Sequence, residues 1–333
     1  MAYNTKKIKK NAFRITKERG VTALRVRVPG GHMRAEYLEI LQKIAEEYGN
    51  GTLHLTTRQG FEIPGISFDD IPEVNKEIVP VIEGLELAIG VDGFSEEEGY
   101  PAAGTRNVSA CIGNRVCRVA NFDTTELAKR IEKAIFPNDY HVKIAITGCP
   151  NDCIKAHMQD FGIIGMVEPE YDAERCIGCN ACVENCKKRV TGALEMKNYK
   201  VKRDHQHCIG CGECIGKCPT GAWSRGEKYW RLIIMGRTGK KNPRLARTFL
   251  NWVKDDAIIK VITNTYDYID EYIDRSLPKE HVGYIVDRTG YPVFKEWALK
   301  GVNLNPKAEI AEYIPFGGYR YERNKNMRNV EGR

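Results

Sequence analysis

The sequence predicts an α+β protein with a separate cysteine-rich module inside its chain. Strand-like and helix-like segments alternate on both sides of residues 172–222, and this middle segment holds eight of the twelve cysteines. It contains few large aliphatic residues, so it cannot fold by apolar burial alone and needs a bound metal. The length of 333 residues is typical of two to three domains.

Residues 1–90 are expected to form a small α+β domain. Thr22–Val28 alternates in character and predicts a strand, and Arg34–Tyr48 carries apolar residues at helical spacing. A second strand is expected over Thr52–Thr56, and a second helix over Asp69–Leu85.

A larger, discontinuous domain of residues 91–168 and 224–318 is expected around the inserted module of residues 169–223, with a basic tail at 319–333. Its predicted helices are Thr124–Phe136, Pro243–Val253, Tyr266–Arg275 and Tyr291–Leu299, and its predicted strands are His141–Thr147, Phe161–Val167, Trp230–Met235 and Ile258–Thr263.

Composition limits the classes of protein. The polar N-terminus lacks the apolar stretch of a secretion signal, and no apolar run of about 18 residues is present, so we expect a cytoplasmic protein without a membrane span. In a reducing compartment twelve cysteines are metal ligands rather than disulfides. The net charge of +7 is compatible with a plain soluble surface, a nucleic acid, an anionic substrate or an anionic cofactor.

Two copies of C-x2-C-x2-C-x3-C lie 32 residues apart, a pattern typical of bacterial ferredoxins with two 4Fe-4S clusters. In this pattern the last cysteine of each copy binds the cluster of the other copy. One cluster is therefore expected on Cys176, Cys179, Cys182 and Cys218, and the other on Cys208, Cys211, Cys214 and Cys186. Structural zinc usually pairs two shorter C-x2-4-C knuckles, so it is the less favoured alternative.

The four remaining cysteines form C-x5-C, with Cys111 and Cys117, and C-x3-C, with Cys149 and Cys153. Four soft thiolates suit either a third iron–sulfur cluster or zinc, and their number alone leaves both open.

Four segments resemble the sirohaem sulfite and nitrite reductase family. They are Gly148-Cys-Pro-Asn-Asp-Cys153 with the C-x5-C pair before it, Arg25-Val-Arg-Val-Pro-Gly-Gly31, Leu55-Thr-Thr-Arg-Gln-Gly60 and Gly236-Arg-Thr-Gly-Lys240. A ferredoxin insertion after the C-x3-C segment is similar to that of the anaerobic and dissimilatory sulfite reductases. The resemblance implies a ferredoxin-like N-terminal domain and a sirohaem/4Fe-4S domain. The family fold has two such halves, and this chain has room for one, so we expect a homo-oligomer.

The resemblance also implies site residues. Cys153 is expected to bridge a 4Fe-4S cluster and the sirohaem iron, with Cys111, Cys117 and Cys149 as the other cluster ligands. The cations expected to bind sulfite and deliver protons are Arg25, Arg106 and Lys143, with His141 where the family has a lysine. The sirohaem is expected to contact Arg27, Thr56, Thr57, Arg58, Gln59, Asn151, Gly236, Arg237, Thr238, Gly239 and Lys240. Without the resemblance, these cations could equally be surface or turn residues.

Together these features favour the catalytic subunit of an anaerobic sulfite reductase, which reduces sulfite by six electrons. The resemblance suggests electrons from an iron–sulfur subunit and a flavin subunit that oxidises NADH. Sirohaem nitrite reductase is an alternative within the same class, and a non-catalytic polyferredoxin electron carrier is another. Binding of nucleic acid through basic residues would leave the arrangement of the cysteines unexplained.

Overall fold

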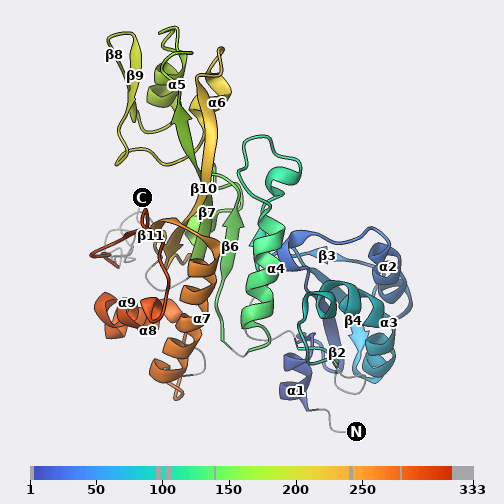
Figure 1. The fold of residues 1–333 in the computed structure, drawn as a ribbon. Coiled ribbons are helices and arrows are strands. Elements are labelled where there is room, and N and C mark those ends of the chain that lie inside the picture. Colours follow the sequence, from blue (N-terminus) through green and yellow to red (C-terminus); the bar gives the residue numbers. More distant parts are fainter. Residues whose placement is uncertain are drawn as a thin grey trace, which may run out of the picture.

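The computed structural model describes residues 4–94, 99–101, 107–138, 140–239, 243–277 and 280–316. Its strands form a four-stranded sheet, a six-stranded sheet and a two-stranded sheet. Figure 1 shows the four-stranded N-terminal sheet beside the six-stranded sheet, with helix α4 (Thr124–Ile135) between them. The cysteine-rich segment projects from one end of the six-stranded sheet. Within the described residues, every helix is too short or too polar to span a lipid bilayer.

The N-terminal unit is an antiparallel sheet in the order β1-β2-β4-β3. Its elements are α1 (Thr5–Lys10), β1 (Phe13–Ile15), β2 (Val21–Val26), α2 (Tyr37–Glu47), β3 (His54–Leu55), β4 (Phe61–Ser67) and α3 (Ile71–Leu85). Apolar residues of α2 and α3 form one core with the sheet, which confirms both predicted helices. The strand predicted over Thr52–Thr56 is β3, which is shorter than expected. Strand β4 was not predicted.

The six-stranded sheet has the order β12-β11-β10-β7-β6-β5. Strands β5 to β7 run parallel, and the others pair antiparallel. The strands are β5 (Ser109–Ala110), β6 (Ile144–Thr147), β7 (Phe161–Tyr171), β10 (Trp223–Ile234), β11 (Arg247–Val253) and β12 (Glu309–Ile310). Helices α4, α7 (Asp255–Tyr272), α8 (Val282–Thr289) and α9 (Tyr291–Leu299) share one hydrophobic core with it.

Two sequence predictions in this sheet region are wrong. Residues 243–253 were expected to be helical, but Arg247–Val253 is β11, which pairs with β10. Residues 258–263 were expected to be a strand, but they lie inside α7. The run is rich in β-branched residues, yet Ile258, Val261, Ile262 and Thr265 fall on one helical face that is buried, and this packing outweighs the local strand preference.

The cysteine-rich segment is carried by the long antiparallel pair β7–β10, which ends with Tyr171 opposite Trp223. Between these strands the chain forms α5 (Ala181–Arg189), the hairpin β8 (Leu194–Lys197) and β9 (Lys200–Arg203), and α6 (Glu213–Lys217). We call residues 172–222 the module. Its small core contains cysteines as well as apolar side chains.

The N-terminal unit meets the rest of the protein at Gly30. Its N–H donates to the Val108 carbonyl at 3.2 Å, and its carbonyl accepts from the Thr125 hydroxyl at 3.1 Å. Gly30 has a φ of +67°, and a Cβ atom there would lie 2.9 Å from the Thr125 methyl carbon and 3.1 Å from the Ala128 Cβ. A side chain would therefore push the N-terminal unit away from α4.

We expect Gly30→Ala to lower the free energy of unfolding by about 2–4 kcal/mol, from the left-handed backbone and the steric clash together. The matched control is Gly20→Ala, because Gly20 has a φ of +82° with no atom within 4 Å of the added carbon. It should cost only about 1–2 kcal/mol. Denaturant unfolding of both variants measures the difference, and equal losses would contradict the close packing at Gly30.

Candidate functional site

Four cysteines gather at one edge of the six-stranded sheet, and we call them the sheet set: Cys111, Cys117, Cys149 and Cys153. Cys111 directly follows β5, and Cys149 and Cys153 follow the parallel neighbour β6, so both strands deliver their cysteines at the same edge. The Cys111 N–H donates to the Ile146 carbonyl at 3.0 Å. Burial raises the pKa of Cys149, and so does the proximity of the other three thiols of this set.

The loop from Cys149 to His157 is shaped by Asp152, which sequence reasoning missed. One Asp152 oxygen accepts the Ala156 N–H at 2.6 Å, and the other is 2.6 Å from Nδ1 of His157. Asp152 has a φ of +47°, so the chain turns sharply just before Cys153. The turn leaves Cys153 exposed, while Cys149 is buried.

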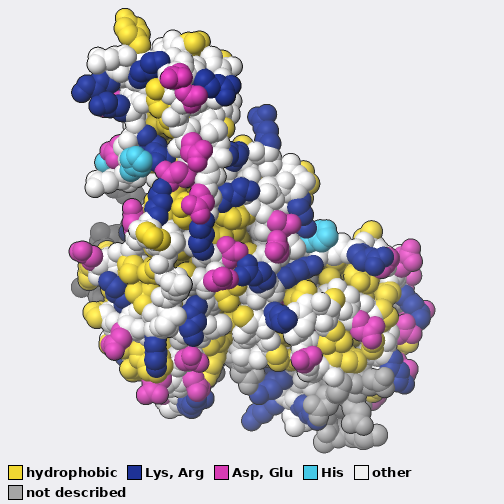
Figure 2. Space-filling view, viewed as in Figure 1, with side chains coloured by type: hydrophobic (Ala, Val, Ile, Leu, Met, Phe, Trp, Pro, Cys, Tyr) yellow, Lys and Arg dark blue, Asp and Glu magenta, His cyan; other side chains and the backbone are white. Residues whose placement is uncertain are grey.

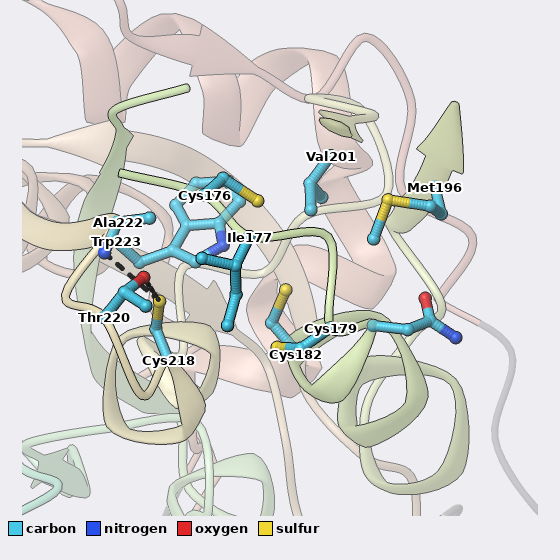
Figure 3. Close-up of a pocket in the computed structure, with 11 residues that line it drawn as sticks. Cys176, Ile177, Cys179, Cys182, Met196, Val201, Cys218, Thr220, Ala222 and Trp223 are labelled. Carbon is cyan, nitrogen blue, oxygen red and sulfur yellow. Dashed lines mark hydrogen bonds between the residues drawn. The ribbon is translucent and has the colours of Figure 1, made fainter. Parts of the chain in front are cut away.

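Seven of the eight module cysteines line two separate cavities. The four that line the first are called the outer set: Cys176, Cys179, Cys182 and Cys218. Figure 3 shows these thiols with Ile177, Met196 and Val201 around the cavity. The Ala222 N–H donates to the Cys218 sulfur at 3.2 Å, as N–H groups do to metal-bound thiolates.

The second cavity is lined by Cys186, Cys208 and Cys214. Cys211 lies close enough to Cys208 and Cys186 for their charges to raise its pKa, so these four form the inner set. Burial, the largest cause, raises the pKa of Cys211 to about 11 and that of Cys214 to about 12. At neutral pH these thiols need a bound metal to become thiolates. In the described residues the thiols surround cavities, and no three of them meet at a single-ion site.

The inner set lies nearer to the sheet set than the outer set does. The Gly210 carbonyl accepts the Val167 N–H of β7 at 2.9 Å. Two residues earlier on β7, the Cβ position of Gly165 is 2.5 Å from the Gly148 carbonyl, next to Cys149. The outer set lies at the far end of β7, where Trp223 lines its cavity opposite Tyr171. The three thiol sets therefore follow one another along β7.

A buried carboxylate, Asp160, lies among three of the cations named from the sequence. It is 3% exposed, and one oxygen accepts the Lys143 N–H at 2.9 Å. The charges of Lys143, Arg58 and Arg237 all act on it. Arg58 also donates to the Gln159 amide oxygen at 2.9 Å. The fold thus brings together Arg58, Lys143 and Arg237, which lie far apart in the chain.

Two expected site arginines form ion pairs with carboxylates of the protein itself. Arg27 is 3% exposed and forms ion pairs with the buried Glu86 and Glu132, the first of them at 3.1 Å. Glu132 lies on α4, so this group links the N-terminal unit to the central domain. Arg25 pairs with Glu62 of β4 at 3.2 Å. A strand position alone could not predict these partners.

The segment Thr56–Gly60 forms a turn that joins the two domains. The Thr56 hydroxyl accepts the Gly60 N–H at 3.0 Å. The Gln59 amide donates to the Ala110 carbonyl at 2.7 Å and accepts the Ala110 N–H at 2.8 Å, next to Cys111. Asn107, which was not predicted, donates to the carbonyls of Val28 and Arg58. Gln59 therefore positions the start of the sheet set.

The other expected residues occupy varied positions. Arg237 is buried and pairs with Asp287 at 2.7 Å, and the ring of His141 lies 5.6 Å from that of His281. Gly236 is buried, where a Cβ atom would lie 2.4 Å from the His157 carbonyl. The remaining described residues are exposed: Thr57, Asn151, Thr238 and Gly239. Arg106, Lys240 and the tail at 319–333 lie outside the described residues.

Comparison with known proteins gives two family matches. Residues 102–305 match the nitrite and sulphite reductase 4Fe-4S domain, and residues 14–81 match the nitrite/sulfite reductase ferredoxin-like half domain. A subunit of the anaerobic sulfite reductase of Salmonella typhimurium is 47% identical over 307 residues, covering 92% of this chain and 91% of that protein. Coenzyme F420-dependent sulfite reductase of Methanocaldococcus jannaschii is 35% identical, covering 83% of this chain and 42% of that protein.

Solved structures share the fold. A dissimilatory sulfite reductase I structure aligns with a TM-score of 0.65 and 18% identity, covering 94% of this chain and 78% of that one. The NirA protein of Mycobacterium tuberculosis aligns with a TM-score of 0.56 and 16% identity, covering 87% of this chain and 44% of that one. Together the matches confirm the predicted family, its α+β fold and the oxidoreductase class.

Asp160 predicts a pH dependence of stability. Burial raises its pKa to about 6 from an ordinary 3.8, although the three cations oppose this. Between about pH 4 and 6 the folded protein still holds a proton that the unfolded chain has released. The free energy of unfolding therefore falls by up to about 3 kcal/mol as the pH rises through this range. Asp160→Asn should be more stable than the wild type above pH 6, with the advantage shrinking towards pH 4.

Denaturant unfolding between pH 4 and 8 measures this difference. The exposed Asp92→Asn removes the same charge and is the control. A difference between Asp160→Asn and the wild type that does not vary with pH would show that Asp160 is not a buried titrating group.

Proposed function

The chain belongs to the nitrite and sulfite reductase family, and from this membership we propose that it is the catalytic subunit of an anaerobic sulfite reductase that reduces sulfite to sulfide. The observation on which this proposal depends is the position of the sheet set at one edge of the sheet, together with the buried and half-buried cations that both domains place around Asp160. The 47% identity to a protein named as an anaerobic sulfite reductase subunit supports sulfite as the substrate.

The residues fit three 4Fe-4S clusters and one sirohaem. The sheet, inner and outer sets each supply four thiols, and the two module cavities combine thiols with apolar walls. The ligation of the module is then crossed, as in a two-cluster ferredoxin, with residues 169–223 as an inserted domain. The exposed Cys153 fits the thiolate shared between the sheet-set cluster and the sirohaem iron. When bound, the sirohaem supplies the iron that takes the sulfur of sulfite and passes electrons to it.

The cations have two tasks in this proposal. Arg58, Lys143 and Arg237 attract an anion or a cofactor carboxylate, and Asp160 keeps this group of positive charges together. Reduction of hydrogensulfite to hydrosulfide takes up six electrons and six protons and releases three waters. Lys143 and His141 are the proposed proton donors, and Arg25 and Arg106 are the further cations of the site. Arg27 does not fit a role as a cofactor ligand, because its guanidinium is engaged with Glu86 and Glu132.

The order of the thiol sets along β7 supports a direction for electron flow. Electrons would pass from a cluster held by the outer set to one held by the inner set and then to one held by the sheet set. We propose an iron–sulfur subunit and a flavin subunit that oxidises NADH as the source, in the cytoplasm.

Exposed apolar side chains near the sheet set support a covered face in the working protein. Leu55, Ile112 and Val116 are 71%, 56% and 74% exposed. Apolar exposure of this extent is typical of a surface that a partner or cofactor covers. Because the family fold has two halves, we propose that a second copy of the chain covers part of this face.

The proposed reaction predicts a stoichiometry. With reduced methyl viologen as the donor, the anaerobically purified holoprotein should consume six equivalents of the one-electron dye for each sulfite. Turnover with nitrite should be slower, and a higher kcat/KM for nitrite would favour the nitrite reductase alternative. No sulfite-dependent oxidation, together with no chlorin absorption, would leave only a polyferredoxin electron carrier.

Lys143→Met should raise the KM for sulfite tenfold or more, since it removes a charged contact of about 1.5–3 kcal/mol. Lys202→Met removes an exposed lysine from β9 of the module and should leave the KM unchanged. The chlorin spectrum should match the wild type in both variants. An unchanged KM in Lys143→Met would remove this lysine from the anion site.

A further inference from the structure

The outer end of the module exposes two large apolar side chains that lie together. Ile177 is 69% exposed and Tyr199, at the tip of the β8–β9 hairpin, is 82% exposed. The Cβ position of Gly178, next to Ile177, is 3.1 Å from the Tyr199 carbonyl and 3.3 Å from its Cβ atom. The two segments therefore lie side by side and form one surface.

The hairpin turn does not explain why a tyrosine is present. Asn198 and Tyr199 have φ values of +52° and +60°, as in a type I′ turn, which favours asparagine followed by glycine. A tyrosine in the left-handed region costs about 1–2 kcal/mol relative to a relaxed backbone. The side chain makes little contact with its own chain in return, because most of it is exposed. Its position suggests a contact with another molecule.

This surface covers the outer thiol set. Ile177 lies between Cys176 and Cys179 and lines their cavity, as do Met196 and Val201 of the hairpin. The Lys200 ammonium donates to the Cys176 carbonyl at 3.0 Å, which holds the hairpin against the cysteine loop. A molecule seated on Ile177 and Tyr199 would therefore lie beside the cavity of the outer set.

The module carries nine Lys and Arg residues against six Asp and Glu residues, of which Asp172 and Glu174 are exposed just before the Cys176–Cys179 loop. The hairpin strands expose Lys197, Lys200 and Lys202 against one exposed acidic residue, Glu195. The end of α5 adds the exposed Lys187, Lys188 and Arg189. Figure 2 shows Lys and Arg side chains on this part of the molecule, with Asp and Glu side chains between them. A small apolar centre with a cationic rim fits a partner with the opposite charge.

We infer that the β8–β9 hairpin and the Cys176–Cys179 loop are the docking surface for an acidic electron-donor protein that carries an iron–sulfur cluster near its own surface. This inference rests on the proposed function only in that the outer set holds a redox cluster. The donor's acidic rim would face the lysines, and its cluster would lie opposite Ile177 and Tyr199. One electron at a time would pass from its reduced cluster to the outer-set cluster, which is reduced as the donor is oxidised.

The test measures reduction of the holoprotein's clusters by stopped-flow absorbance, without sulfite, so that it does not depend on catalysis. The probe donor is a dithionite-reduced, acidic two-cluster bacterial ferredoxin, and reduced methyl viologen is the small-molecule control. Tyr199→Gly suits the turn better than tyrosine, so it should not disturb folding, and Lys197→Glu reverses one rim charge. The control Tyr313→Gly removes a tyrosine that is 74% exposed and lies outside the module.

We expect the double variant Tyr199→Gly/Lys197→Glu to lower the second-order rate constant with ferredoxin at least tenfold and to leave the rate with viologen unchanged. In the wild type the ferredoxin rate should fall as salt rises. Equal ferredoxin rates in wild type and double variant, or no ferredoxin reduction of the wild type, would overturn the inference. The inference would also be overturned if sedimentation showed a homo-oligomer for the wild type and a monomer for the double variant, because the surface would then join two copies of the chain. Failure of the proposed function would appear separately, as clusters that accept electrons without sulfite turnover.

Discussion

The arrangement of the whole site depends on the close approach of backbone segments to β7. This strand pairs in parallel with β6 and antiparallel with β10, so it lies inside the sheet and cannot move independently. At Gly165 the absence of a side chain lets the Gly148 carbonyl approach to 2.5 Å from the Cβ position, with the Phe122 ring 3.0 Å away. That ring stacks on Trp230 of β10 at 3.8 Å. The loop with Cys149 is therefore pressed onto the strand that also carries the module, and a larger residue at 165 would separate them.

The second constraint is the junction between the N-terminal unit and the central domain. Arg27 lies between two buried carboxylates, and removing one partner of such a group is costly because a bare charge stays buried. Gln59 forms two hydrogen bonds with Ala110 beside Cys111, and Asn107 donates to two carbonyls of the N-terminal unit. Polar residues that resemble cofactor ligands in the sequence therefore hold the two units in register. Their effect on the site is indirect, through the position of β5 and of Cys111.

The sequence predicted some parts of the structure well for a physical reason. Short, regular cysteine spacing reflects local loop geometry, so the partition into sets of four could be proposed without a structure, and the strongly periodic helices α2, α3 and α4 were found. Residues 258–263 were misassigned because their β-branched residues suit a strand locally, while their burial on one helical face is set by the packing of α7. Side-chain partners were equally hidden: no spacing shows that Arg27 faces Glu132 rather than a cofactor. Asp160 was missed because a single aspartate between Gln159 and Phe161 forms no motif, and only the fold brings Lys143, Arg58 and Arg237 around it.

The module's attachment fits the proposal that one chain holds both an electron path and an anion site. Beyond the β7–β10 pair, Arg203 pairs with Glu168, and Arg225 donates to the Asn121 amide oxygen. The Asn121 N–H in turn donates to the Gly148 carbonyl at 2.7 Å, so this residue connects the base of the module to the loop of the sheet set. Electron transfer between centres weakens steeply with distance, and a projecting module on a flexible linker would make that distance variable. Because β7 and β10 and these side-chain links hold the module, the inner set keeps a fixed position relative to Cys149. The outer end of the module lies away from the cations around Asp160, so the proposed donor would bind there without disturbing them.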